Sequence, residues 1–203
     1  MATPRFHSVA TTLVLLLIAT GCAGTGQGPA QPSPQPASRY PSTEADARFM
    51  SAMIGHHAQA VVMAGWAPTH GASASVRRLA ERILSGQQDE IATMRQWLRD
   101  RGQPVPEGHH TEHGHLMPGM LTGAQMKQLE EARGPEFDRL FLTFMIQHHR
   151  GAVSMVKELF GTPGAAQDDT VFKFANDVNV DQTTEVARME RMLSALPAGE
   201  PSS

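Results

Sequence analysis

The chain has 203 residues, 40% of them hydrophobic, and a formal net charge of −3, which is the arithmetic of a globular protein with one sizeable core. There is no basic excess to hold nucleic acid, and aromatic residues at 5% are too few for stacking on single-stranded bases. The single cysteine excludes an intramolecular disulfide, a CxxC redox pair and a thiolate zinc site. The unusual content is 12 Met and 10 His.

Residues 1–21 are predicted to be a lipoprotein signal peptide. Arg5 precedes a short apolar run from Leu13 to Ile18, well below the roughly 20 residues of a membrane-spanning helix. The run ends in Ala19-Thr20-Gly21-Cys22, which resembles a bacterial lipobox with its lipidated cysteine. We therefore expect export, lipid anchoring through Cys22 and an extracytoplasmic position at the cell membrane. An ordinary secretory leader with an incidental cysteine is the alternative.

The composition then changes twice along the chain. Residues 22–42 are rich in Gly, Pro, Gln and Ser and cannot bury enough apolar surface to fold, so we predict a disordered tether. The remainder, 43–197, is predicted to be one domain. It divides into a first repeat at 43–101, a connector at 102–134 and a second repeat at 135–197.

The two repeats carry the same helical hairpin. The segment Met53 to Met63 aligns with Met145 to Met155 at an offset of 92 (145 − 53), and Gln87 and Glu90 match Gln182 and Glu185 at an offset of 95 (182 − 87). Apolar residues recur at helical spacing in each segment, and no stretch alternates with the period of a strand. Capping-box patterns begin helices at Thr43–Asp46 and at Thr122–Gln125, and Gly71, Gly102 and Gly161 interrupt or end them. The pattern predicts an all-α, four-helix bundle built from two hairpins.

Potential metal ligands lie on the inward face of the first helix in each repeat. His56 and His148 each have Met three residues before and seven after, and a second His directly after. These positions share one side of a helix. An Asp lies three turns before each second His on the same face. The candidates are Met53, His56, His57, Met63, Asp46, Met145, His148, His149, Met155 and Asp138.

Each of these residue types also has a structural interpretation. Methionines at helical spacing fill cores, as we expect of Met94, Met189 and Met192. Buried histidines are often hydrogen-bonded structural residues, and Asp in a first helical turn is favoured by the helix dipole. Antiparallel pairing places Gln87 at the level of His56 and Gln182 at the level of His148, where each amide could orient a ring nitrogen.

The connector holds a second cluster of potential ligands, His109, His110, His113, His115, Met117 and Met120. His-rich tracts of this kind are typical of metal binding, although a polar loop with incidental histidines has the same composition. Imidazole and thioether ligands without thiolates favour copper in an oxidising compartment.

The doubled Met-Ile-x-His-His pattern, followed by Ala and Met, and the Met117-Pro118-Gly119-Met120 segment resemble the domain-of-unknown-function family 305, over roughly Glu44 to Leu196. The resemblance implies a ferritin-like four-helix fold, export and copper binding of the CopM type. The chain lacks the Glu-x-x-His pairs of di-iron ferritins, so ferroxidase chemistry is not expected.

These observations predict an exported, membrane-anchored metal-binding protein, with copper as the expected metal, which sequesters or hands on metal in the cell envelope. We expect no enzyme activity, since no motif marks a substrate pocket, although copper oxidoreduction stays open. The alternative is a structural or interaction module in which His and Met only pack. The sequence names no protein partner.

Overall fold

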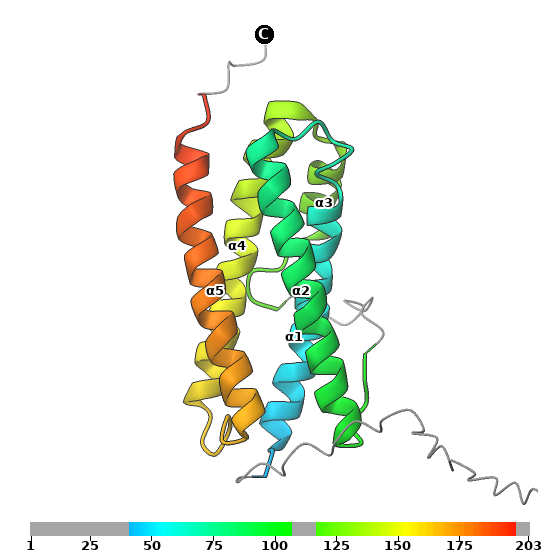
Figure 1. Ribbon diagram of the computed structural model, residues 1–203, viewed down its shortest axis with the longest axis vertical. Helices are drawn as coiled ribbons and strands as arrows, with labels where there is room; N and C mark the ends of the chain where they lie inside the picture. Colours follow the sequence, from blue (N-terminus) through cyan, green and yellow to red (C-terminus); the bar gives the residue numbers. More distant parts are fainter. Residues whose placement is uncertain (1–40, 107–116, 198–203) are drawn as a thin grey trace, which may run out of the picture. The chain divides into compact units, whose positions relative to one another are not determined.

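The computed structural model describes residues 41–106 and 117–197. Within these ranges the chain forms five helices and no strand: α1 (Glu44–Gly65), α2 (Ala74–Asp100), α3 (Gly123–Glu131), α4 (Gly134–Gly161) and α5 (Asp169–Ser194) (Figure 1). The predicted all-helical bundle is confirmed. The leader, Cys22, most of the tether and the connector residues His109, His110, His113 and His115 lie outside the described residues.

The caps explain where the helices begin. At α1, Thr43 Oγ1 accepts a hydrogen bond from Asp46 N, and Asp46 returns one by accepting from Thr43 N at 2.7 Å. Thr122 and Gln125 form the same reciprocal pair at the start of α3. Both predicted capping boxes are therefore present. At α5, Asp168 accepts from the backbone N–H groups of Thr170 and Val171.

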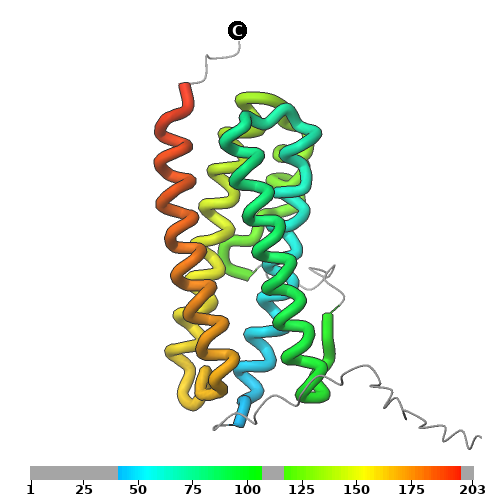
Figure 2. The backbone as a smooth tube through the Cα atoms, viewed as in Figure 1, coloured from blue at the N-terminus to red at the C-terminus, as the bar shows by residue number. Residues whose placement is uncertain are grey.

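The helices form two hairpins that meet through their first members. The helix α1 packs on α2, α4 packs on α5, and α1 contacts α4, while the short α3 touches α1 and α4 (Figure 2). Asp46 at the start of α1 accepts from Ala166 N just after α4, and Asp138 at the start of α4 accepts from Ser73 N just after α1. The start of each helix thus lies beside the end of the other, so α1 and α4 are antiparallel.

A polar layer divides the core into two apolar clusters. The first includes Met63, Leu79, Phe137, Phe141 and Met145. The second includes Met53, Ile91, Trp97, Met155 and Phe174. On α1 the layer falls between Met53 and Met63, and on α4 between Met145 and Met155. Its members are His56, His57, His148 and His149, all completely buried. None of the helices in the described ranges is long and apolar enough to cross a membrane.

Candidate functional site

The four histidines of this layer form a compact cluster where α1 crosses α4. The ring centroids of His56 and His148 lie 3.9 Å apart, in a tilted arrangement. His57 lies 6.4 Å from His56, and His149 lies 6.2 Å from His148, between ring centroids. The structure therefore brings together the two His-His pairs that the sequence separates by 92 residues (148 − 56).

The central pair, His56 and His148, is fixed by backbone carbonyls. The Nε2 of His56 lies 3.0 Å from the carbonyl oxygen of Pro118, and the Nε2 of His148 lies 2.9 Å from the carbonyl oxygen of His56. A carbonyl oxygen only accepts, so in both rings Nε2 carries the proton and donates it. The two Nδ1 atoms are then unprotonated in the neutral rings.

The outer pair faces carboxylates. The Nε2 of His149 lies 2.8 Å from Oε2 of Glu185. The Nε2 of His57 lies at the same distance, 2.8 Å, from Oε2 of Glu90, but at an angle that falls outside a hydrogen bond. In both cases the carboxylate lies on the Nε2 side of the ring.

All four Nδ1 atoms are buried without a hydrogen-bond partner among the described residues. Another histidine of the bundle, His70, shows the contrast. Its Nδ1 lies 3.0 Å from Thr69 Oγ1, and its Nε2 lies 2.8 Å from the Glu130 carbonyl. Buried polar atoms are normally satisfied, so four unpaired nitrogens in one layer require an explanation.

Burial keeps the central pair neutral. It lowers the pKa of His56 to about 3, with a further contribution from the neighbouring His57. Burial, and then the nearby His56, hold the pKa of His148 well below its usual value. A neutral imidazole with a free nitrogen lone pair is the form that binds metals. A donor N–H held by a carbonyl or carboxylate is the usual support of a ligating histidine.

The Nδ1 atoms of His56 and His148, which belong to the two neutral rings, could therefore act as metal donors in this layer. Within the described part of the chain, no three or more His, Cys, Asp or Glu side chains gather closely enough to hold a metal ion. Thioethers are also available nearby. Met53, Met63, Met145 and Met155 are buried on α1 and α4, one or two turns from these imidazoles.

The segment 117–121 closes one side of the cluster. Gly119 has a φ of +79° and lies against Gly151 of α4, where an added Cβ on Gly151 would come within 1.9 Å of the Pro118 carbonyl oxygen. The side-chain amide of Gln59 donates to the Leu121 carbonyl at 3.0 Å and accepts from Leu121 N at 2.8 Å. This contact holds Pro118 against His56. In the same segment Met117 is half-buried and Met120 buried.

Two sets of candidates have other partners. The carboxylate of Asp46 binds Thr43 N and Ala166 N, and that of Asp138 binds Ser73 N. The two aspartates thus anchor turns, a structural role that differs from the helix-dipole interpretation given above. The expected role of the glutamines is wrong, because neither Gln87 nor Gln182 hydrogen-bonds a histidine.

The residues that the sequence reasoning missed are Glu90 and Glu185. They approach the outer histidines, His57 and His149, and lie one turn beyond the glutamines along α2 and α5. A signal existed, since both were matched between the repeats at the same offset as the glutamines. No sequence signal pointed to the Pro118 carbonyl, because every residue has a backbone carbonyl and the sequence does not show which one faces His56.

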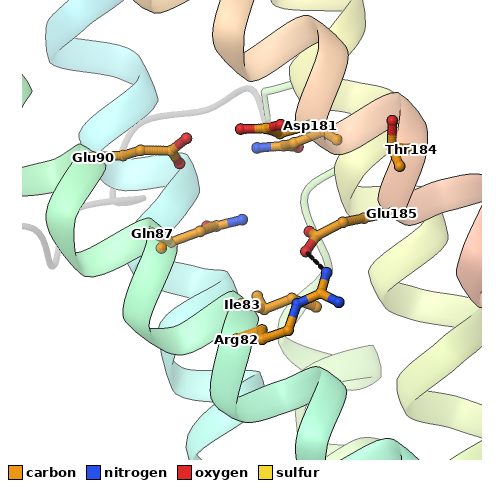
Figure 3. Close-up of a pocket in the computed structure, with 9 residues that line it drawn as sticks. Arg82, Ile83, Gln87, Glu90, Asp181, Thr184 and Glu185 are labelled. Carbon is orange, nitrogen blue, oxygen red and sulfur yellow. Dashed lines mark hydrogen bonds and ion pairs between the residues drawn. The ribbon is translucent and has the colours of Figure 1, made fainter.

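Above the outer histidines, α2 and α5 border a groove of about 280 Å³. Figure 3 shows Gln87 and Glu90 reaching into it from α2, and Asp181 and Glu185 from α5. Arg82 spans the groove to Glu185 at 3.2 Å. Although burial acts to raise it, the pKa of Glu185 is lowered by the hydrogen bond from His149 and by Arg82. Burial, the facing Glu90, and Asp177 and Glu185 on the same helix raise the pKa of Asp181.

Residues 46–193 match the family described as "Domain of unknown function (DUF305)". The chain belongs to the DUF305 family. A DUF305 fragment from Deinococcus radiodurans is 31% identical, with a TM-score of 0.68, over 77% of this chain and 99% of that one. A DUF305 protein from Streptomyces coelicolor, whose name proposes secretion, is 30% identical with a TM-score of 0.66, over 78% and 98%.

This DUF305 chain is also similar to CopM in its Cu(II)-bound form, at 28% identity and a TM-score of 0.62, over 73% of this chain and 95% of CopM. CopM has also been solved with Cu(I) and with silver. No protein of curated function matches the chain.

Proposed function

We propose that this DUF305 protein binds copper in the cell envelope, where it sequesters the metal or hands it on, and that it is not an enzyme. The observation that carries the proposal is the pair of buried, unpartnered Nδ1 atoms on His56 and His148, whose rings are 3.9 Å apart. Both rings are neutral, and both have their other nitrogen held by a carbonyl oxygen.

The donor chemistry favours copper over other divalent metals. Imidazole binds Cu(II), Zn(II) and Ni(II), while the thioether selects Cu(I). The described residues near the pair offer methionines and lack any thiolate. The similarity to CopM, which has been solved with both oxidation states of copper, supports the same choice.

Burial of the pair favours storage or transfer over catalysis. His56 and His148 are completely buried, and the segment 117–121 covers His56 through Pro118. A metal held by the pair would be screened from water and from bulky substrates. A soft metal ion would enter and leave through fluctuations of the surrounding helices.

Export and anchoring complete the proposal. The lipobox-like Ala19-Thr20-Gly21-Cys22 would attach the chain to the membrane, and residues 22–42 would hold the bundle away from it. The similar Streptomyces protein, whose name proposes secretion, supports an extracytoplasmic location. The connector histidines His109, His110, His113 and His115, with Met117 and Met120, would form a second copper site.

Copper titration of three variants tests the proposal. The first replaces His56 and His148 by Ala, the second replaces the four connector histidines, and the third is the control His70→Ala, whose ring nitrogens both have partners. We expect the first two to lose separate parts of the bound copper. The control should lower the melting temperature with copper affinity unchanged.

The opposite pattern would favour a structural module of the envelope. If His56 and His148 are only packing residues, their replacement lowers the melting temperature and leaves the copper stoichiometry and affinity as in the wild type. Removal of the connector histidines would then abolish all tight binding.

A further inference from the structure

The groove between α2 and α5 carries an excess of negative charge. Its walls bear Glu90, Asp181 and Glu185, and the lining includes one cationic side chain, Arg82. That guanidinium is already paired with Glu185 at 3.2 Å. Three carboxylates against one guanidinium leave the groove with a net charge of −2, and burial, together with the neighbouring carboxylates, raises the pKa of Asp181.

The floor of the groove holds amides without partners. Gln87 is 4% exposed and Gln182 is 3% exposed, and both line the groove. The Oε1 of Gln87 and both side-chain amide atoms of Gln182 have no hydrogen-bond partner among the described residues. In Figure 3 the Gln87 side chain extends from α2 toward α5, into the groove. A buried amide without a hydrogen-bond partner lowers the stability of the fold, so these amides favour a polar ligand or water in the groove.

We propose that this groove binds a hard divalent cation, of the Mg²⁺ or Mn²⁺ type, which keeps its hydration shell. The bound waters would bridge the cation to the carboxylates of Glu90 and Asp181 and to the amides of Gln87 and Gln182.

Two observations favour a hydrated ion over direct coordination. The carboxylates do not approach one another closely enough to form a ligand set among the described residues. The groove measures about 280 Å³, whereas six waters occupy about 180 Å³ in the liquid. Mg²⁺ sheds water reluctantly and usually keeps several waters when a protein holds it through one or two carboxylates.

The site is separate from the proposed copper pair in its donors as well as in its position. Its lining offers carboxylate and amide oxygens and no thioether, which suits Mg²⁺ and Mn²⁺ and disfavours Cu(I) and Ag(I). The two repeats contribute equivalent residues to its opposite walls, Gln87 with Gln182 and Glu90 with Glu185. The proposed divalent-cation site in the groove does not depend on copper binding by His56 and His148.

Electron paramagnetic resonance of Mn²⁺ added to the full chain is the direct test, since the signal of free aqueous Mn²⁺ falls as the ion binds. The informative variant is Asp181→Asn, because Asp181 is exposed and its replacement leaves the core intact. The matched control is Asp89→Asn on α2, also exposed but outside the groove. Circular dichroism checks that both variants remain folded.

We expect wild type to bind Mn²⁺ and excess Mg²⁺ to displace it, while Ag⁺ does not. Asp181→Asn should weaken binding about tenfold, equivalent to 1.4 kcal/mol, and Asp89→Asn should leave it unchanged. No binding by the wild type, equal weakening in both variants, or displacement by Ag⁺ but not by Mg²⁺ would overturn the proposal.

Discussion

Replacing Gly151 by Ala tests how the segment 117–121 is held against α4. The new Cβ would lie 1.9 Å from the Pro118 carbonyl oxygen and 2.5 Å from Gly119 Cα. Both are backbone atoms, so no side-chain rotation can relieve the clash. The segment must move away from α4, and the Pro118 carbonyl must move with it.

The magnitude follows from what the segment loses. Three hydrogen bonds are at stake, one from His56 to Pro118 and two between Gln59 and Leu121, each contributing about 0.5–1.5 kcal/mol. The buried Leu121 side chain adds about 2 kcal/mol when exposed. Alanine returns about 1 kcal/mol through its higher helix propensity. We expect a net loss of about 2.5–5.5 kcal/mol in the free energy of unfolding.

Urea denaturation measures this loss, with Gly86→Ala as the matched control. Gly86 also lies within a helix, and a Cβ there meets no atom within 4 Å, so the control should gain up to about 1 kcal/mol. If Gly151→Ala were as stable as the control, the close contact between α4 and this segment would be refuted. Since Pro118 orients the His56 ring, we also expect copper affinity to fall about 10–100-fold.

Three further predictions concern other parts of the chain. Burial acts to raise the pKa of Asp168, but the hydrogen bonds from Arg101, Val171 N and Trp97 outweigh burial and lower it. The ionised carboxylate therefore stabilises the folded protein fully above about pH 4, and this stabilisation is lost as the pH falls through the lowered pKa. Asp168→Asn should therefore cost about 1–3 kcal/mol at pH 7, and thermal melts of the two proteins should converge towards pH 2; a constant difference would contradict this. Asp46→Ala and Asp138→Ala should each cost about 1–3 kcal/mol, because they leave the N–H of Ala166 or Ser73 unpaired. Copper titration should show unchanged copper affinity in both variants. A loss of copper affinity without a matching loss of stability would indicate that the aspartates are metal ligands. Cys22→Ser should release the protein from the membrane fraction, and unchanged detergent partitioning would exclude the lipid anchor.

Helix positions were predictable because they depend on local spacing. The apolar stripe through Phe49, Met53 and Ala60 identifies the buried face of α1, and the Thr43–Asp46 pair marks its start. Gly102, with a φ of +62°, follows the end of α2 closely. Such features act within a few residues, so sequence alone contains them.

The partners of the histidines were only partly predictable. The matched Glu90 and Glu185 are visible in the sequence, but the histidine that each one faces depends on how the hairpin arms align. Counting from a turn at Gly71 placed Gln87 opposite His56. The observed contact between His57 and Glu90 puts the midpoint between residues 73 and 74. A shift of 2.5 residues in the turn (73.5 − 71) moves the facing position on α2 by five residues, about 1.4 helical turns. The Glu90 carboxylate therefore lies at His57, whereas the ring of His56 contacts the Pro118 carbonyl.

Nuclear magnetic resonance of the ¹⁵N-labelled histidine rings during titration with Ag⁺, a diamagnetic substitute for Cu(I), tests the central claim most directly. Before metal is added, His56 and His148 should be neutral, with the proton on Nε2 and none on Nδ1. On titration their Nδ1 resonances should shift while both Nε2 protons remain, and both resonances of the partnered His70 should stay in place. Nδ1 resonances of His56 and His148 that do not move at saturating Ag⁺, or a proton found on either Nδ1, would contradict the account.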